Sequence, residues 1–199
     1  ALSAACALGP NLVVNGSFEQ PWATEYNFGW FTYNFYNSIP GWNRSYGQAF
    51  ELQRTLPGGW TAAEGLQWLE LDAHDSTGIY QQILTTPGHG YRLTFAFSTR
   101  GDGPDAYDGV QVLWNGSPVL TVIQSGRSTL NNTWYYYTID LIATSYISTL
   151  EFRDYSAQNN SYGSYIDDVR LQLIPEPASM LALGTGLVGL LARRRRVRA

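Results

Sequence analysis

Short runs of alternating apolar residues, separated by turn residues, fill this chain between residues 11 and 173. In the run 91–99, tyrosine, leucine and phenylalanine occupy every second position, and mostly polar residues fill the others. This period of two is typical of a strand with one buried face. Residues 110–123 form two apolar runs around Asn115-Gly116. Because both turn positions tolerate a positive φ, this segment predicts a β-hairpin.

Other parts of the chain also have the composition of strands, and no segment before residue 178 shows an apolar repeat of 3.6 residues. The predicted strands lie in 67–73, 79–84, 134–142, 148–155 and 164–174. The stretch 21–48 is dense in aromatic residues without clean alternation, and we interpret it as a long loop or broken strands. The sequence therefore predicts an all-β domain over residues 8–173, a β-sandwich or jelly roll.

Residues 1–7 are typical of the end of a secretory signal peptide. Ala5-Cys6-Ala7 fits the small-x-small pattern of a cleavage site. Cys6 is the one cysteine of the sequence, so the domain that follows relies on core packing rather than on a disulfide. An apolar N-terminus without a targeting role is the alternative.

The predicted domain is acidic. Residues 8–174 carry 15 Asp and Glu against 7 Arg, a net charge of about −8. A domain of this charge repels phosphate backbones, so we expect no nucleic-acid partner. The same charge is compatible with bound cations such as calcium.

The sequence holds no recognisable catalytic motif. It has two histidines, His74 and His89, and no G-x-S-x-G elbow, H-E-x-x-H motif or phosphate-binding glycine loop. Nothing marks Glu51 and Glu70 as a glycosidase pair. We therefore expect a protein that is not an enzyme. A cleft with two facing carboxylates, or His74 beside a serine, would instead indicate a hydrolase.

Three phrases, at 11–21, 65–100 and 164–171, follow one another in a characteristic order. Their order and spacing resemble the galactose-binding-like jelly rolls. That group includes many carbohydrate-binding modules and a related plant cell-wall domain family of poorly defined function. The resemblance covers about residues 11–173.

The resemblance implies a structural calcium that ties the first strand to the last. It places this role on Glu19 and Asp167, with Asp168 as a neighbour. Calcium takes six to eight oxygen ligands, and backbone carbonyls near residues 15–17 would supply some of them. Alternation also places Asp167 on an inward face, where a carboxylate needs a cation or hydrogen-bond donors. The alternative is that both carboxylates accept backbone N–H bonds or pair with an arginine.

Aromatic residues crowd the region 22–42, and another tryptophan follows at position 60. Sugar rings stack on flat aromatic faces, and Trp and Tyr combine such a face with a polar group. The predicted glycan-binding residues are Trp30, Tyr33, Tyr36 and Trp60. The alternative is that these rings fill the core, which is what we expect for Trp42.

The C-terminal segment 174–199 has three parts in a fixed order. Pro175, Glu176 and Pro177 precede fifteen uncharged residues, and these precede Arg193, Arg194, Arg195 and Arg196. As a helix, the uncharged run spans about 22 Å, which is less than the hydrocarbon core of about 30 Å. We expect a short transmembrane helix with the arginines in the cytoplasm and the domain outside.

This three-part order closely resembles the PEP-CTERM sorting signal of exopolysaccharide-producing Gram-negative bacteria. The resemblance implies that an exosortase recognises the motif and processes the protein near it. It also implies an exported protein, anchored in the membrane only transiently, in the cell envelope or extracellular matrix. An ordinary tail anchor is the alternative.

Together these features predict a non-catalytic extracellular module that binds carbohydrate or associates with an exopolysaccharide or biofilm matrix. A structural surface protein without a ligand and a hydrolase of matrix polysaccharides are the alternatives.

Overall fold

The computed structural model describes residues 7–27, 30–35, 37–55, 59–100, 107–125 and 132–175. In these residues the chain forms β-strands and no helix, as the sequence predicted. The expectations for residues 1–6, for Tyr36 and for the tail from Glu176 onward lie outside the described residues. Among the residues that are described, no helix is long and apolar enough to cross a membrane.

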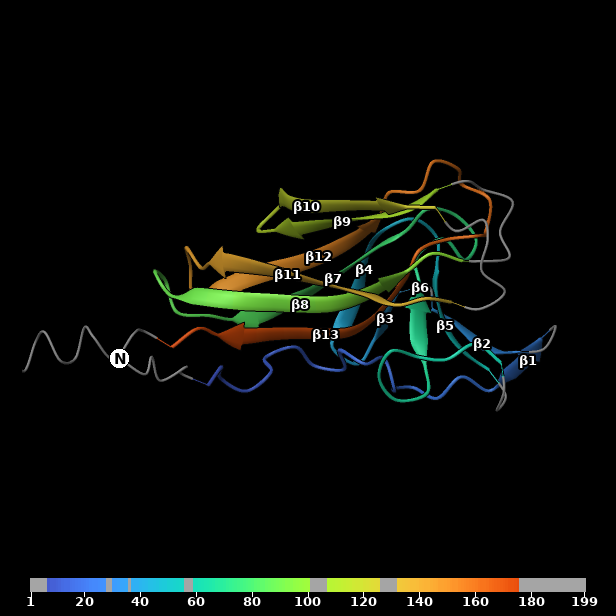
Figure 1. Cartoon of the computed structure of the whole chain (residues 1–199), viewed down its shortest axis with the longest axis horizontal. Helices are drawn as coiled ribbons and strands as arrows, with labels where there is room; N and C mark the ends of the chain where they lie inside the picture. Colours follow the sequence, from blue (N-terminus) through green and yellow to red (C-terminus); the bar gives the residue numbers. More distant parts are fainter. Residues whose placement is uncertain are drawn as a thin grey trace, which may run out of the picture.

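The described strands form two antiparallel sheets that pack face to face (Figure 1). Sheet A has the order β1 (Glu25–Asn27), β2 (Trp30–Phe35), β5 (Phe50–Thr55), β6 (Trp68–Glu70), β13 (Tyr165–Leu173), β8 (Gly90–Ser98) and β11 (Tyr135–Ile142). Sheet B has the order β10 (Ser117–Gln124), β9 (Asp108–Trp114), β12 (Ile147–Asp154), β7 (Gly78–Leu84), β4 (Trp42–Tyr46) and β3 (Ser38–Ile39). This architecture confirms the predicted jelly-roll β-sandwich.

The core lies between the two sheets, and strand alternation supplies its side chains. In β8 the predicted inward face, at every second position from Tyr91 to Phe97, is buried. The ring of Phe95 contacts that of Phe152 from sheet B edge to face, with centroids 5.1 Å apart. Trp42 is fully buried, as expected, and its indole N–H donates to the carbonyl of Asn15 at 3.1 Å.

The hairpin predicted at Asn115-Gly116 is present between β9 and β10. Both residues have positive φ, 52° and 80°, and the strands pair from Ser117 opposite Trp114. This φ region is accessible to Asn and Gly at little cost, so the local sequence alone determines the turn.

The stretch 21–48 is made of short strands, β1 to β4, rather than a long loop. Phe31, Tyr33 and Phe35 pack against the core, while Thr32 and Asn34 point to the opposite side of β2. The alternation is therefore real. It is hard to see in the sequence because aromatic residues stand at odd and even positions between 30 and 36.

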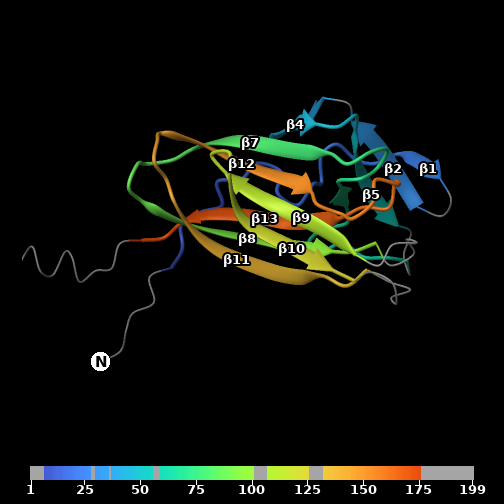
Figure 2. The same cartoon turned by 90° about the horizontal axis from the view of Figure 1, so that it is seen from above.

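The two ends of the described chain lie side by side. The N–H of Gly9 donates to the carbonyl of Leu173 at 3.0 Å, and Asn11 forms a bridge with Gln172. Figures 1 and 2 both place these ends at one end of the sandwich, while β1, β2 and β5 lie at the other.

Candidate functional site

A polar cavity of about 400 Å³ opens at the end of the molecule formed by β1, β2, β5 and β6. It is lined by Glu25, Tyr26, Thr32, Asn34, Glu51, Glu70, Ala73, His74 and Arg100. Its size falls within the range of small-molecule sites in proteins. We call it the polar cavity.

The floor of the polar cavity is a row of side chains from three neighbouring strands. Asn34 of β2 is paired with Glu51 of β5, and Glu51 is paired with Glu70 of β6. Directly paired residues in antiparallel strands have their Cβ atoms about 4.5–5.5 Å apart on the same face. Because Leu52 and Leu69 face the core, this row lies on the other side of sheet A.

Glu70 is held by donors on several sides. The guanidinium of Arg100 and the N–H of Gly163 donate to Oε1, at 3.0 and 3.1 Å. The side-chain amide of Gln53 donates to the other oxygen of Glu70 and also to Glu51, at 2.7 Å in the second case. Arg100 and Glu70 are 9% and 1% exposed, so this ion pair is buried.

Burial favours the neutral forms of the two facing carboxyls. Burial raises the pKa of Glu70 to about 8; the charge of Arg100 opposes this rise and that of Glu51 adds to it. Burial also raises the pKa of Glu51, against the hydrogen bond from Gln53. Adjacent carboxylates rarely ionise together, so at neutral pH the pair holds a proton.

Two other lining groups are suited to a ligand. The side-chain oxygen of Asn34 is buried and has no hydrogen-bond partner in the part of the chain that the structure describes. Buried polar atoms in native proteins nearly always have a partner, so this oxygen is an acceptor to which a ligand can donate. Tyr26 lies at the rim with 61% of its surface exposed, and its ring contacts Phe31 edge to face at 5.2 Å.

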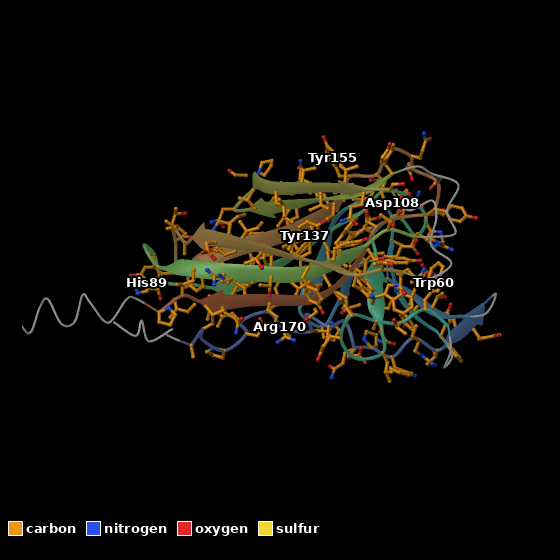
Figure 3. All side chains as sticks on the ribbon, viewed as in Figure 1. Trp60, His89, Asp108, Tyr137, Tyr155 and Arg170 are labelled. Atoms are coloured by element: carbon orange, nitrogen blue, oxygen red, sulfur yellow. The ribbon has the colours of Figure 1, made fainter. Side chains whose placement is uncertain are left out.

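The predicted glycan-binding aromatics have different surroundings. Trp30 is the first residue of β2. The ring of Tyr33 packs on the core, with its centroid 4.4 Å from that of Phe35. Trp60, labelled in Figure 3, contacts Tyr165 edge to face at 5.9 Å, and Tyr165 is paired with Glu70 of β6. Neither Tyr33 nor Trp60 lines the polar cavity. Their roles in glycan binding stay predictions.

Glu19 and Asp167 bind the same loop, residues 62–67, through backbone N–H groups. One carboxylate oxygen of Glu19 accepts the N–H groups of Leu66 and Gln67, at 2.8 and 2.9 Å. One oxygen of Asp167 accepts those of Ala63 and Glu64 at the same distances. Each carboxylate thus ties this loop to the sandwich.

These contacts match the hydrogen-bonded alternative for Glu19 and Asp167. Asp167 is fully buried, and burial raises its pKa to about 8. Asp168 pairs with Arg170 at 2.6 Å (Arg170 is labelled in Figure 3). In the described residues no group of three or more Asp, Glu, His or Cys side chains is placed to hold a metal. The oxygens of both carboxylates keep lone pairs that suit calcium, so the structural calcium at Glu19 and Asp167, with Asp168 as a neighbour, stays a prediction.

A second cavity, of about 460 Å³, lies on sheet B and is mainly apolar. Its lining includes Tyr107, Ile123 and Tyr155, all about half exposed (Figure 3 shows Tyr155 at the edge of the molecule). His89 lies far from both cavities, in the turn between β7 and β8 (Figure 3). Of these two cavities, the polar cavity is the one that combines an aromatic rim with paired polar groups on its floor.

The fold and the polar cavity together define a class: a jelly-roll β-sandwich domain with a polar, ligand-sized hollow at one end. Residues 11–172 match the family model described as "Protein of unknown function (DUF642)", and the chain belongs to this family. Residues 173–196 match the PEP-CTERM protein-sorting motif, which confirms the resemblance seen in the tail. The motif marks an exported protein that is sorted at the cell envelope, and it implies processing by an exosortase.

Curated relatives match the same domain within much longer proteins. The chain is 28% identical over 161 residues to the multifunctional-autoprocessing repeats-in-toxin of Vibrio vulnificus. The corresponding toxin of Vibrio cholerae serotype O1 is 27% identical. The aligned stretch covers 80% of this chain and 3% of each toxin, so the chain spans a small fraction of these relatives.

Solved structures share the fold at low identity. The K1 cleaved adhesin domain of Lys-gingipain from Porphyromonas gingivalis W83 has a TM-score of 0.50 and 15% identity, covering 72% of this chain and 98% of that one. An arabinose-bound α-L-arabinofuranosidase has a TM-score of 0.51 and 11% identity, covering 83% of this chain and 27% of that one. At these identities the likeness shows the fold alone.

Proposed function

We propose that this protein is an exported, non-catalytic carbohydrate-binding domain whose ligand occupies the polar cavity. The observation that carries the proposal is the row of Asn34, Glu51 and Glu70 on the floor of the cavity, with the exposed ring of Tyr26 at its rim. A sugar has hydroxyl groups around its edge and apolar C–H faces. It therefore requires polar partners and an aromatic surface together, and the cavity offers both.

The sorting motif supports the cellular part of the proposal. The protein is sorted at the cell envelope, where polysaccharides are abundant ligands. We place the mature domain on the surface or in the exopolysaccharide matrix of a Gram-negative bacterium, after a transient membrane-anchored stage. There the domain associates with the biofilm polysaccharide through its cavity.

A hydrolase is the second candidate, because Glu51 and Glu70 meet the condition of two facing carboxylates in a cleft. The contacts of Glu70 argue for binding without turnover. Its two oxygens already accept bonds from Arg100, Gly163 and Gln53, and 1% of its side chain is exposed. A general acid must instead donate its proton to the ligand. Release of reducing ends that is lost in Glu51→Gln would establish the hydrolase.

The binding test uses the full chain and an array of immobilised bacterial and plant oligosaccharides. Replacing Tyr26 by Ala removes a ring contact worth about 0.5–1.5 kcal/mol, which weakens binding about 2- to 12-fold. Tyr146→Ala is the matched control, because Tyr146 is 75% exposed and does not line the cavity. No bound glycan, or equal losses in the two variants, contradicts the proposal. If no glycan binds, the result favours a structural surface protein without a ligand.

A further inference from the structure

The polar cavity is lined by more acidic than basic side chains. Three of its lining residues, Glu25, Glu51 and Glu70, carry carboxyl groups, against the guanidinium of Arg100. Asn34 adds a buried carbonyl oxygen without a partner among the described residues. This lining favours a ligand that donates hydrogen bonds and carries no negative charge.

The positive charge of Arg100 is used within the protein. Its guanidinium donates to Glu70 at 3.0 Å and to the carbonyl of Ser161 at 3.2 Å. It also lies over the ring of Tyr162, 4.6 Å from the centroid. A carboxylate ligand would have to compete with Glu70 for Arg100, so the cavity disfavours acidic sugars.

Among the described residues, Glu51 has no cationic partner of its own. Gln53 donates to it at 2.7 Å, but no arginine or histidine of the described chain forms an ion pair with it. Arg100 and His74 act on Glu51 only through longer-range attraction. Burial raises the pKa of Glu51, as expected for a carboxyl that lacks a close cation. A cation at Glu51 would take the place of the proton that the pair otherwise holds.

We propose that the polar cavity takes an amino sugar, a hexosamine unit with a free ammonium group, and that Glu51 is the partner of this ammonium. The proposal rests on the carbohydrate-binding function above and names the ligand class of the same site. An ammonium carries three N–H donors and no acceptor, which matches the lining. The sugar hydroxyls donate to Asn34, and the ring lies against Tyr26 at the rim.

The test compares oligosaccharides of equal length in calorimetric titrations of the full chain. The probes are oligomers of glucosamine, N-acetylglucosamine, glucose and galacturonic acid. A hydrogen bond between charged groups strengthens binding about 10- to 100-fold. We therefore expect the glucosamine oligomer to bind at least tenfold more tightly than the N-acetylated one. We expect this preference for the glucosamine oligomer to persist in 0.3 M salt if the ammonium contacts Glu51 directly. A preference that came only from long-range attraction to the acidic protein would be screened at this salt concentration.

Two variants separate a site from general attraction to an acidic protein. Glu51→Gln preserves the shape of the side chain and removes its charge. It should bring the affinities for the glucosamine and N-acetylglucosamine oligomers within about threefold of each other. Glu64→Gln removes the same charge from an exposed residue outside the cavity and should keep the preference. Near-ultraviolet circular dichroism establishes that both variants are folded.

The possible outcomes distinguish the two proposals. If a neutral or N-acetylated oligomer binds as tightly as glucosamine and Asn34→Ala abolishes that binding, the amino-sugar inference fails and the carbohydrate-binding function stands. If glucosamine binding weakens equally in Glu51→Gln and Glu64→Gln, the inference also fails. If none of the four oligomers binds and no glycan on the oligosaccharide array binds, both the amino-sugar inference and the proposed carbohydrate-binding function fail.

Discussion

The buried carboxyl of Glu70 gives the sharpest test of how the cavity floor is built. An unfolded glutamate has a pKa of about 4.3, and burial raises the folded value to about 8. The folded state therefore binds more protons than the unfolded state between these values. The stability contributed by the neutral carboxyl is fully present below about pH 4.3 and is lost as the pH rises toward 8.

Replacing Glu70 by Gln removes this titration. A single group contributes at most about 1.4 kcal/mol per pH unit, which gives an upper limit of about 4 kcal/mol between pH 5 and pH 8. Glu51 takes up part of the shared proton, so we expect about 2–4 kcal/mol. At pH 5 the variant is less stable than the wild type by about 1–3 kcal/mol, because the amide cannot reproduce every contact of the acid. This deficit should shrink or reverse by pH 8.

The assay is urea unfolding of wild type, Glu70→Gln and Glu64→Gln at pH 5, 6, 7 and 8. Glu64 is exposed, so its variant should follow the wild-type profile. The buried carboxyl of Asp167 titrates in all three proteins and cancels in the comparison. Parallel pH profiles for wild type and Glu70→Gln would refute the reasoning, because they would mean that Glu70 is already ionised in the folded protein at pH 5.

Two further predictions concern the loop held by Glu19 and Asp167. If calcium binds there, adding it at 100 times its Kd stabilises the fold by about 2.7 kcal/mol, and the substitution Asp167→Asn removes this stabilisation. An unchanged Tm after a chelator is added would mean that no stabilising ion is bound. Gly65→Ala should cost more than Gly88→Ala in urea unfolding. Both glycines have positive φ, 72° and 82°, but only at Gly65 would the added carbon meet a neighbour, an oxygen of Glu19 at 2.4 Å. If both variants lost the same free energy of unfolding, backbone strain alone, about 1–3 kcal/mol, would account for the loss in each.

Local patterns were enough to predict much of the sandwich. The strand at β8 has one buried face that is visible within nine residues, and the Asn115-Gly116 turn is determined by the φ preferences of two residues. Both signals depend only on neighbours in sequence. The same reasoning placed Asp167 on the core face with Val169, and this was wrong. A bulge at Asp168 shifts the register, so Ile166 and Val169 face the core, whereas Asp167 is buried under the loop 62–67.

The candidate site depends instead on how distant strands align. Asn34, Glu51 and Glu70 become a row only through the register of β2, β5 and β6, which no short stretch of sequence determines. Each residue alone is an ordinary polar position on a strand. Residues 50–55 carried a usable signal, since Leu52 is buried between Glu51 and Gln53, but β5 was not predicted. The density of aromatic residues led to the prediction of a binding site made of aromatic rings, whereas the floor of the polar cavity is built from carboxyl and amide groups.

The end of β13 and the polar cavity lie at opposite ends of the same sandwich. The last described residue, Pro175, follows β13 next to the start of the domain, and β1 and β2 form the far end (Figures 1 and 2). A domain held at its C-terminus therefore presents the cavity away from its point of attachment. This geometry suits the proposed function before and after processing, because attachment at residue 175 does not block the end of the sandwich where a polysaccharide would bind.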